Sequence, residues 1–127
     1  MADYTRKYKI LVIDDDENIR KLLTAILQSS DHEVILADGP AEGLVAALRE
    51  RPDLILLDIF MEPVNGLQVL SQLRKIVAST KVPIIMLTAA NTVNSINQAF
   101  ELGANDYMTK PIDFNMFKQK VDHCLQQ

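Results

Sequence analysis

Acidic, hydroxyl and basic side chains follow the ends of apolar segments along this chain. Asp14 and Asp15 come directly after one such segment, and Asp58 closes another. Thr88 and Lys110 follow two further segments. Neighbouring carboxylates repel one another, and each costs free energy when it leaves water without a cationic partner. If these five residues converge, the acids therefore need a cation.

The chemistry of such a group would be phosphoryl transfer assisted by a metal. Paired carboxylates with a third across a cleft suit Mg²⁺, which prefers hard oxygen ligands. With the metal present, Asp58 could attack a phosphorus atom and hold an aspartyl phosphate, a form of nucleophilic catalysis. Lys110 and the metal would neutralise the transferring oxygens, and Thr88 would donate a hydrogen bond to the phosphoryl group.

Each of these residues also has an ordinary structural interpretation when it is taken alone. An aspartate before ENIR is typical of a helix N-cap or first turn. Thr88 could cap a helix, and Lys110 could be a solvated turn residue. Asp58 is harder to explain in this way, because it ends an apolar segment with no local partner in the sequence. The joint interpretation is favoured, since the separate ones require several coincidences.

Five short apolar segments must position these residues, and they alternate with helical patterns. This alternation predicts a doubly wound α/β fold with a five-stranded parallel sheet, whose ligand site lies beyond the carboxyl ends of the strands. The predicted strands are KILVI (9–13), EVILA (33–37), LILLD (54–58), VPIIML (82–87) and a weak DYMT (106–109).

The spacing of apolar residues between these segments predicts amphipathic helices. The fourth of them ends at Gly103, where a C-cap glycine is expected. The apolar stripes comprise Ile19, Leu22, Leu23, Ile26 and Leu27; Ala41, Leu44, Val45 and Leu48; Leu70, Leu73, Ile76 and Val77; Val93, Ile96, Ala99 and Phe100; and Phe114, Phe117, Val121 and Leu125.

Length and composition restrict the class of protein. We expect a single domain over residues 1–127, with a core of about 8–126, because 127 residues is the size of one ordinary domain. The net charge of -4 argues against a nucleic-acid surface, which needs a basic patch. One cysteine and the lack of an apolar amino-terminal stretch favour the cytoplasm, and the apolar runs are too short to span a membrane.

The sequence resembles the response regulator receiver domains of two-component signalling. The likeness covers nearly the whole chain, in the stretches KILVIDDDENIR, PDLILLDIFMEPVNG, VPIIMLTA and AFELGANDYMTKP. It implies a flavodoxin-like (βα)5 fold with strand order 2-1-3-4-5. It also implies a signalling switch that is not an enzyme in the usual sense, because it catalyses only its own phosphorylation and dephosphorylation.

The resemblance assigns a role to each matching residue. Asp58 would be the phospho-acceptor, Asp15 a direct Mg²⁺ ligand, and Asp14 a ligand through water. The metal would also be held by Asp58 and by the backbone carbonyl of Phe60. Thr88 and Lys110 would be the switch hydroxyl and the phosphate-pairing lysine. Tyr107 would be the switch aromatic, although alone it could be plain packing on an edge strand, and Pro111 falls where the family carries a cis proline.

The loop after the acceptor departs from the family pattern. Glu62 stands between Met61 and Pro63, where the family usually has Met-Pro directly, and it adds a negative charge near the cleft. We expect slow self-dephosphorylation, because Phe60 and Ala90 cannot orient a water by hydrogen bonding.

Three classes of function can be compared. The first is a switch phosphorylated by a sensor histidine kinase or phosphotransfer protein, which relays the change through Thr88 and Tyr107 to a downstream effector protein or fused output domain. A homodimer that forms on phosphorylation is left open. The second is a Mg²⁺-dependent phosphohydrolase of the haloacid dehalogenase type, which needs a second acid where this chain has Phe60. The third is a docking scaffold that has lost its site residues, and none is lost here.

The remaining candidates receive structural interpretations. His32 and His123 have no acidic or cysteine neighbours at metal-ligand spacing, so we predict two surface residues. Cys124 is predicted to be a partly buried apolar residue of the last helix.

Overall fold

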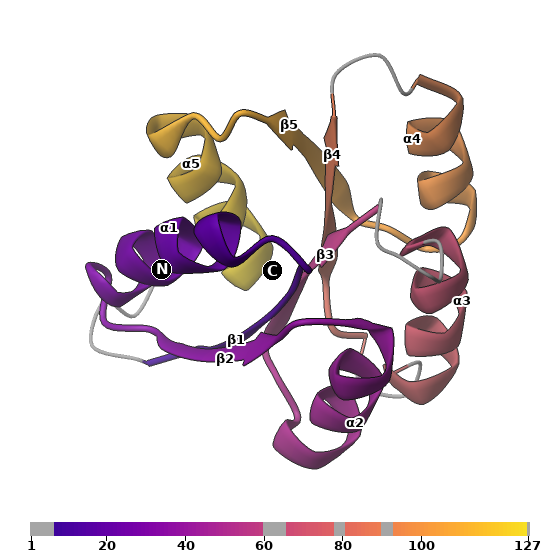
Figure 1. The fold of residues 1–127 in the computed structure, drawn as a ribbon, viewed down its shortest axis with the longest axis horizontal. Helices are drawn as coiled ribbons and strands as arrows, with labels where there is room; N and C mark the ends of the chain where they lie inside the picture. The colour runs from indigo at the N-terminus through magenta and orange to yellow at the C-terminus, as the bar shows by residue number, and fades with distance from the viewer. Residues whose placement is uncertain (1–6, 60–65, 78–80, 90–92, 127) are drawn as a thin grey trace.

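One parallel sheet forms the centre of the molecule (Figure 1). The structure, a computed structural model, describes residues 7–59, 66–77, 81–89 and 93–126, without the side chains of Val77, Ala89 and residues 93–95. The sheet has five strands in the order β2-β1-β3-β4-β5, which confirms the predicted fold class. The strands are β1 (Lys9–Ile13), β2 (Glu33–Ala37), β3 (Leu54–Asp58), β4 (Ile84–Ala89) and β5 (Asp106–Lys110).

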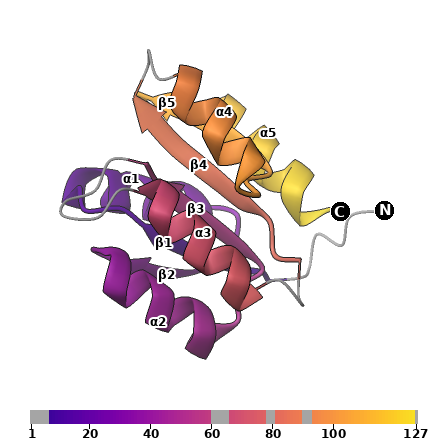
Figure 2. The ribbon, with the colours of Figure 1, turned by 90° about the vertical axis from the view of Figure 1, so that its right-hand side faces the viewer.

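Helices cover both faces of the sheet (Figures 1 and 2). One face carries α1 and α5, and the other carries α2, α3 and α4, so the core is divided into two apolar layers. This division follows from the parallel connections, each of which must cross over the sheet through a helix. The helices are α1 (Glu17–Gln28), α2 (Pro40–Glu50), α3 (Gly66–Val77), α4 (Val93–Glu101) and α5 (Phe114–Leu125).

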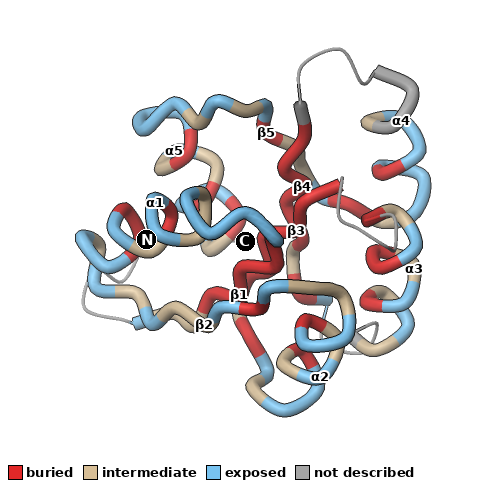
Figure 3. Tube along the Cα trace, viewed as in Figure 1, coloured by how far each residue is buried: buried red, intermediate tan, exposed pale blue. Residues whose placement is uncertain are grey.

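The strand β3 lies in the middle of the sheet and is buried along its whole length (Figure 3). Its sequence LILLD is apolar without alternation, as expected for a parallel strand covered on both faces. The polar residue that ends it, Asp58, is therefore held by a rigid element.

The strand β4 begins later than predicted. It starts at Ile84 instead of Val82 and continues to Ala89. Pro83 has no backbone N–H to donate to a neighbouring strand, although its carbonyl still accepts a hydrogen bond from Ile55 at 3.0 Å. Val82 is nevertheless buried, which is why it resembled a strand residue in the sequence.

Among the described residues, each connection from a helix to the next strand contains one residue with a left-handed backbone. These residues are Asp31, Arg51, Lys81 and Gly103, with φ angles of 62°, 49°, 55° and 109°. The predicted cap at Gly103 is confirmed, because the N–H of Ala104 donates to the carbonyl of Ala99 at 2.9 Å, as in a Schellman motif.

Several predictions of burial were wrong. Five residues placed in apolar stripes are 43% to 63% exposed: Leu22, Val45, Leu48, Phe100 and Phe114. His32 was predicted to lie on the surface, but it is half-buried, with its ring edge against Tyr8 at 5.6 Å between centroids. Cys124 is buried in the last helix, as predicted. Within the described ranges, no helix is long and apolar enough to cross a membrane.

Candidate functional site

The carboxyl ends of β1 and β3 bring three carboxylates together. Asp14 and Asp15 follow β1, and Asp58 is the last residue of β3. One oxygen from each of the three lies within 4.8 Å of the others. The cause is the pairing of β1 with β3, in which Ile13 lies opposite Leu57. The predicted convergence of these acids is thus present in the structure.

The three acids differ in their access to water. Asp14 is 0% exposed and Asp58 is 3% exposed, whereas Asp15 is exposed. Asp14 Oδ1 accepts a hydrogen bond from the backbone N–H of Asp16 at 2.9 Å. The backbone carbonyl of Asp14 accepts one from Arg20 Nη1 at 2.7 Å. Two acids are therefore held inside the protein, and the third lies where a ligand can enter.

The aspartate that caps α1 is the third of the acidic run. Asp16 is the N-cap, and its side chain accepts a hydrogen bond from the backbone N–H of Asn18 at 2.9 Å. The ordinary N-cap interpretation therefore applies to Asp16, which leaves Asp14 and Asp15 for other roles.

Lys110, at the end of β5, lies between the two buried acids. Its Nζ is 3.1 Å from Asp14 Oδ2 and 3.5 Å from Asp58 Oδ1. Burial lowers the pKa of Lys110, but contact with Asp14 and Asp58 outweighs burial, so its pKa is raised above the ordinary value. The ammonium therefore stays charged at neutral pH. The peptide bond between Lys110 and Pro111 is cis, as the resemblance implied.

The cluster has the properties of a site for a hard divalent cation. Asp14 Oδ2 is buried and has no hydrogen-bond partner among the described residues apart from the Lys110 ammonium, which lies 3.1 Å away. Among the described residues, the Lys110 ammonium contacts two of the three carboxylates, and the nearby Arg20 guanidinium contacts the backbone carbonyl of Asp14. Carboxylate oxygens of this kind are the ligands that Mg²⁺ prefers, so the donor set fits that ion.

Three of the residues on which predictions about the site depend are not among those that the structure describes. Phe60, whose carbonyl is expected to bind the metal, lies outside the described residues, as do Glu62 and Ala90. The expectations that depend on them remain predictions.

Thr88 and Tyr107 lie on the same face of the sheet. Thr88 is fully buried near the end of β4 and lies opposite Thr109 of β5, while Tyr107 lies opposite Met86. Since side chains alternate along a strand, Thr88 shares its face with Met86. Met86 and Tyr107 both belong to the apolar layer that includes Ala99 of α4. The predicted switch residues therefore face α4.

Two residues that sequence reasoning missed hold the Tyr107 ring. Phe100 of α4 contacts it edge to face, with 6.1 Å between the ring centroids. Lys120 of α5 lies 5.0 Å from the ring centroid, and its Nζ donates to the carbonyl of Tyr107 at 2.8 Å and to Asp106 Oδ1 at 2.8 Å. The ring is thus placed between α4 and α5.

A sequence signal for Lys120 did exist. It lies three residues after Phe117 and directly before Val121, both of which are buried on the inner side of α5. A lysine at such a position of an amphipathic helix indicates a buried partner for its ammonium.

Gly66 packs against the end of the acceptor strand. Its N–H donates to the carbonyl of Ile59 at 2.7 Å. A Cβ on Gly66 would lie 2.2 Å from the backbone oxygen of Asp58 and 2.7 Å from the Cα of Ile59. Because these neighbours are backbone atoms and cannot move aside cheaply, only glycine fits here.

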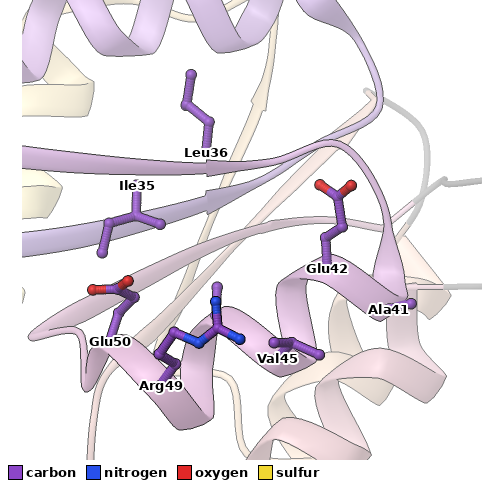
Figure 4. A pocket seen from close by; sticks show the side chains of 8 residues that line it. Ile35, Leu36, Ala41, Glu42, Val45, Arg49 and Glu50 are labelled. Carbon is purple, nitrogen blue, oxygen red and sulfur yellow. The ribbon is translucent and has the colours of Figure 1, made fainter.

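A second concave feature lies between the edge strand β2 and α2 (Figure 4). This groove of about 410 Å³ has an apolar wall that includes Ile35 and Val45, with Glu42, Arg49 and Glu50 beside it. It shares no lining residue with the carboxylate cluster. The groove therefore does not compete with the cluster as the reactive site.

Known proteins share both the sequence and the fold. Residues 10–122 match the family model described as response regulator receiver domain. The chain is 45% identical over 119 residues to the alkaline phosphatase synthesis transcriptional regulatory protein PhoP of Bacillus subtilis, covering 94% of this chain and 49% of that protein. It is 35% identical to Protein PilH of Pseudomonas aeruginosa, covering 92% of this chain and 97% of that protein.

Among solved structures, the Vibrio cholerae chemotaxis protein CheY4 superimposes with a TM-score of 0.88 at 26% identity, covering 94% of this chain and all of that one. A response regulator from Chloroflexus aurantiacus gives 0.90 at 27% identity, covering 96% and 100%. The chain spans about half the length of the first curated relatives it matches.

Proposed function

The chain belongs to the response regulator receiver domain family, and from this premise we propose that it is a signalling switch phosphorylated on Asp58 by a sensor histidine kinase. One observation carries the proposal. Asp58 is buried at the end of the central strand, within reach of both the Asp14–Asp15 pair and the Lys110 ammonium. This is the arrangement that phosphoryl transfer to a carboxylate requires.

The transfer exchanges one bond to phosphorus for another. An oxygen of Asp58 forms a bond to phosphorus while the bond between phosphorus and the donor's histidine nitrogen breaks, and the freed imidazole keeps the electron pair. Lys110 already contacts Asp58 and stays charged, so it is placed to pair with the phosphoryl oxygens. Thr88, buried near the end of the adjacent strand, donates its hydroxyl to the product.

We propose that Asp14, Asp15 and Asp58 hold Mg²⁺, together with the carbonyl of Phe60. The proximity of the three carboxylates and the burial of Asp14 Oδ2 beside them support this ligand set. The ion supplies positive charge that offsets the repulsion among the acids and between them and the incoming phosphoryl group.

Phosphorylation would replace the single negative charge of the carboxylate with a phosphoryl group that carries a charge of about -2. Thr88 and Tyr107 then carry the change to the surface formed by α4, β5 and α5. Support comes from the packing, because Tyr107 contacts Phe100 of α4 and Lys120 of α5. Phosphorylation would change the populations of two states of this surface, and the downstream partner would distinguish these states.

The alternative, a haloacid dehalogenase type of phosphohydrolase, is disfavoured. That chemistry needs a second acid two residues after the nucleophile, and this chain has Phe60 there. The strand order and the family match also favour a response regulator receiver domain over this class of enzyme.

Further parts of the proposal concern its setting. We assign all of residues 1–127 to one receiver domain that acts in the cytoplasm, that catalyses only its own phosphorylation and dephosphorylation, and that does not bind nucleic acid directly. The output is a downstream effector protein or a fused domain, since curated relatives such as PhoP are about twice as long and are named transcriptional regulators.

Incubation with acetyl phosphate and Mg²⁺ tests the proposal. Intact mass should show one added phosphoryl group, which is lost on hydroxylamine treatment, and Asp58→Asn should not acquire it. Asp122→Asn, which removes an exposed acid of α5, is the matched control and should be labelled like the parent. Label that resists hydroxylamine, or equal label without divalent metal, would contradict the assignment.

A further inference from the structure

The guanidinium of Arg74 connects the segment after α4 to α3 and to the segment before β4. Arg74, in the last turn of α3, donates from Nε to the carbonyl of Gly103 at 2.8 Å. It donates from Nη1 to the carbonyl of Val82 at 2.6 Å, and from Nη2 to Asn105 Oδ1. The three acceptors lie just before β4 and in the connection from α4 to β5. One side chain therefore joins three segments of the chain.

Asn105 extends this contact to the beginning of β4. Its backbone N–H donates to the carbonyl of Ile84 at 2.8 Å, and its Oδ1 accepts from the N–H of Ile84 at 2.9 Å. The same Oδ1 accepts from Arg74, so in these contacts the side chain of Asn105 acts only as an acceptor.

Charge and space both restrain this end of α4. A cation beside the last carbonyls of a helix is stabilised by the helix dipole. Gly103 has a φ of 109°, and a Cβ there would lie 2.8 Å from the Cγ of Arg74. The connection therefore packs directly on the arginine stem, and the end of α4 has little freedom to move.

The amino end of α4 has a different place in the fold. It follows β4, whose Thr88 lies beside the acceptor strand, whereas the Arg74 contacts lie at the opposite end of the sheet. With nine residues, α4 is about 13 Å long. A rigid helix fixed at one end responds to a change at the other by tilting.

We propose that Arg74 is a positioning residue of the switch: it fixes the carboxyl end of α4 and the start of β5, so that phosphorylation of Asp58 tilts α4 about this fixed end. The inference rests on the proposed function. The pivot lies where Arg74 makes its contacts.

Two-dimensional NMR of the parent and of Arg74→Gln, before and after phosphorylation, tests the inference. In the parent, amide shifts should change at Ile96 and Tyr107 and stay unchanged at Gly103 and Asn105. In Arg74→Gln, phosphorylation should proceed at the parent's rate, because the site is remote, but the changes should extend to Gly103 and Asn105. If Arg74 only stabilised the fold, its replacement would not change which amides respond to phosphorylation.

Two variants serve as controls. Lys75→Gln removes the same charge from the neighbouring exposed position and should respond like the parent. Asn105→Asp keeps both accepted bonds, so its pattern should also match the parent. If Arg74→Gln does not fold, Arg74→Lys replaces it, since an ammonium lacks the planar fork that reaches three acceptors at once.

The outcomes separate the two proposals. If the parent responds and the Arg74 variant responds at the same residues only, the pivot is wrong and the switch stands. If the parent shows no shift change beyond the acceptor loop, the relay to α4 is wrong, and the inference that rests on it is overturned as well.

Discussion

The two ends of the sheet differ in how their charged side chains are paired. At the carboxyl ends of the strands, three acids crowd around one lysine, and a buried oxygen of Asp14 has no hydrogen-bond partner among the described residues apart from that lysine. At the amino ends, the charged side chains of Lys9 and Arg74 are paired with backbone atoms, although Nδ1 of His32 is buried there without a hydrogen bond among the described residues. Lys9 donates its backbone N–H to Asp53 at 2.8 Å and its Nζ to the carbonyl of Glu50 at 3.1 Å.

The difference shows how the fold divides stability and function. Carboxylates held close together oppose folding, because like charges repel one another. Satisfied groups such as those around Arg74 oppose unfolding, because separating them would leave donors and acceptors unpaired. The amino ends of the strands therefore stabilise the fold, and this stability allows the carboxyl ends to hold the group of acids.

The largest effect is expected where glycine packs against the acceptor strand. Gly66→Ala should lower the free energy of unfolding by about 3 kcal/mol, because the new methyl meets backbone atoms of Asp58 and Ile59. Urea unfolding measures the loss. The control is Gly39→Ala, which has nothing within 4 Å and should cost no more than about 1 kcal/mol as an N-cap change. Equal losses in the two variants would show that close packing does not restrict the reactive end.

A smaller effect should distinguish the two acids after β1. In metal-free buffer, Asp14→Ala should destabilise by about 1 to 2 kcal/mol, because the N–H of Asp16 loses its acceptor. Asp15→Ala, which removes only an exposed and repelled charge, should leave stability unchanged or raise it by less than about 0.5 kcal/mol.

Thermal melts with and without Mg²⁺ complete this second comparison. The parent should gain stability from the ion, because binding to the folded state alone stabilises it. Asp15→Ala should gain less. Strong destabilisation of metal-free Asp15→Ala would show that this acid supports the fold and is not held in excess for a ligand.

The smallest effect concerns acid sensitivity at the amino end. Burial lowers the pKa of His32, and Asp122, Asp31 and Asp53 offset this only in part. As pH falls through the ordinary value of about 6.5, the unfolded chain takes up a proton before the folded chain does, so folding loses stability. His32→Gln should therefore lose less stability than the parent between about pH 7.5 and about pH 5.5, by under about 1 kcal/mol. A larger loss of stability in His32→Gln than in the parent would contradict this prediction.

Most of the fold could be predicted from the sequence because its central strands, β1, β3 and β4, are buried on both faces. A continuous apolar run such as LILLD ends at a polar residue, and parallel pairing then places the ends of neighbouring strands together. This reasoning was enough to bring Asp14, Asp58 and Lys110 into one group. It needed no knowledge of side-chain packing.

The contacts that escaped prediction join residues distant in the sequence. Arg74 finds Gly103 across 29 positions, and Lys120 finds Asp106 across 14. Both cations lie within the apolar stripe of their helix, next to Leu73 and Val121, so the pattern indicated a buried partner without identifying it. The identity of a partner depends on how helices pack on the sheet, which local periodicity does not encode.

The strand order also has a consequence during synthesis. Beyond the pair of β1 and β2, each later strand has its place at the same side of the sheet, in the order in which it leaves the ribosome. Two of the acids follow the first strand and the other ends the third, whereas Lys110 ends the fifth. A nascent chain therefore carries its acids well before the lysine that neutralises them. The site is complete only when the fifth strand has joined, so a segment that is made later determines when Asp58 meets its lysine.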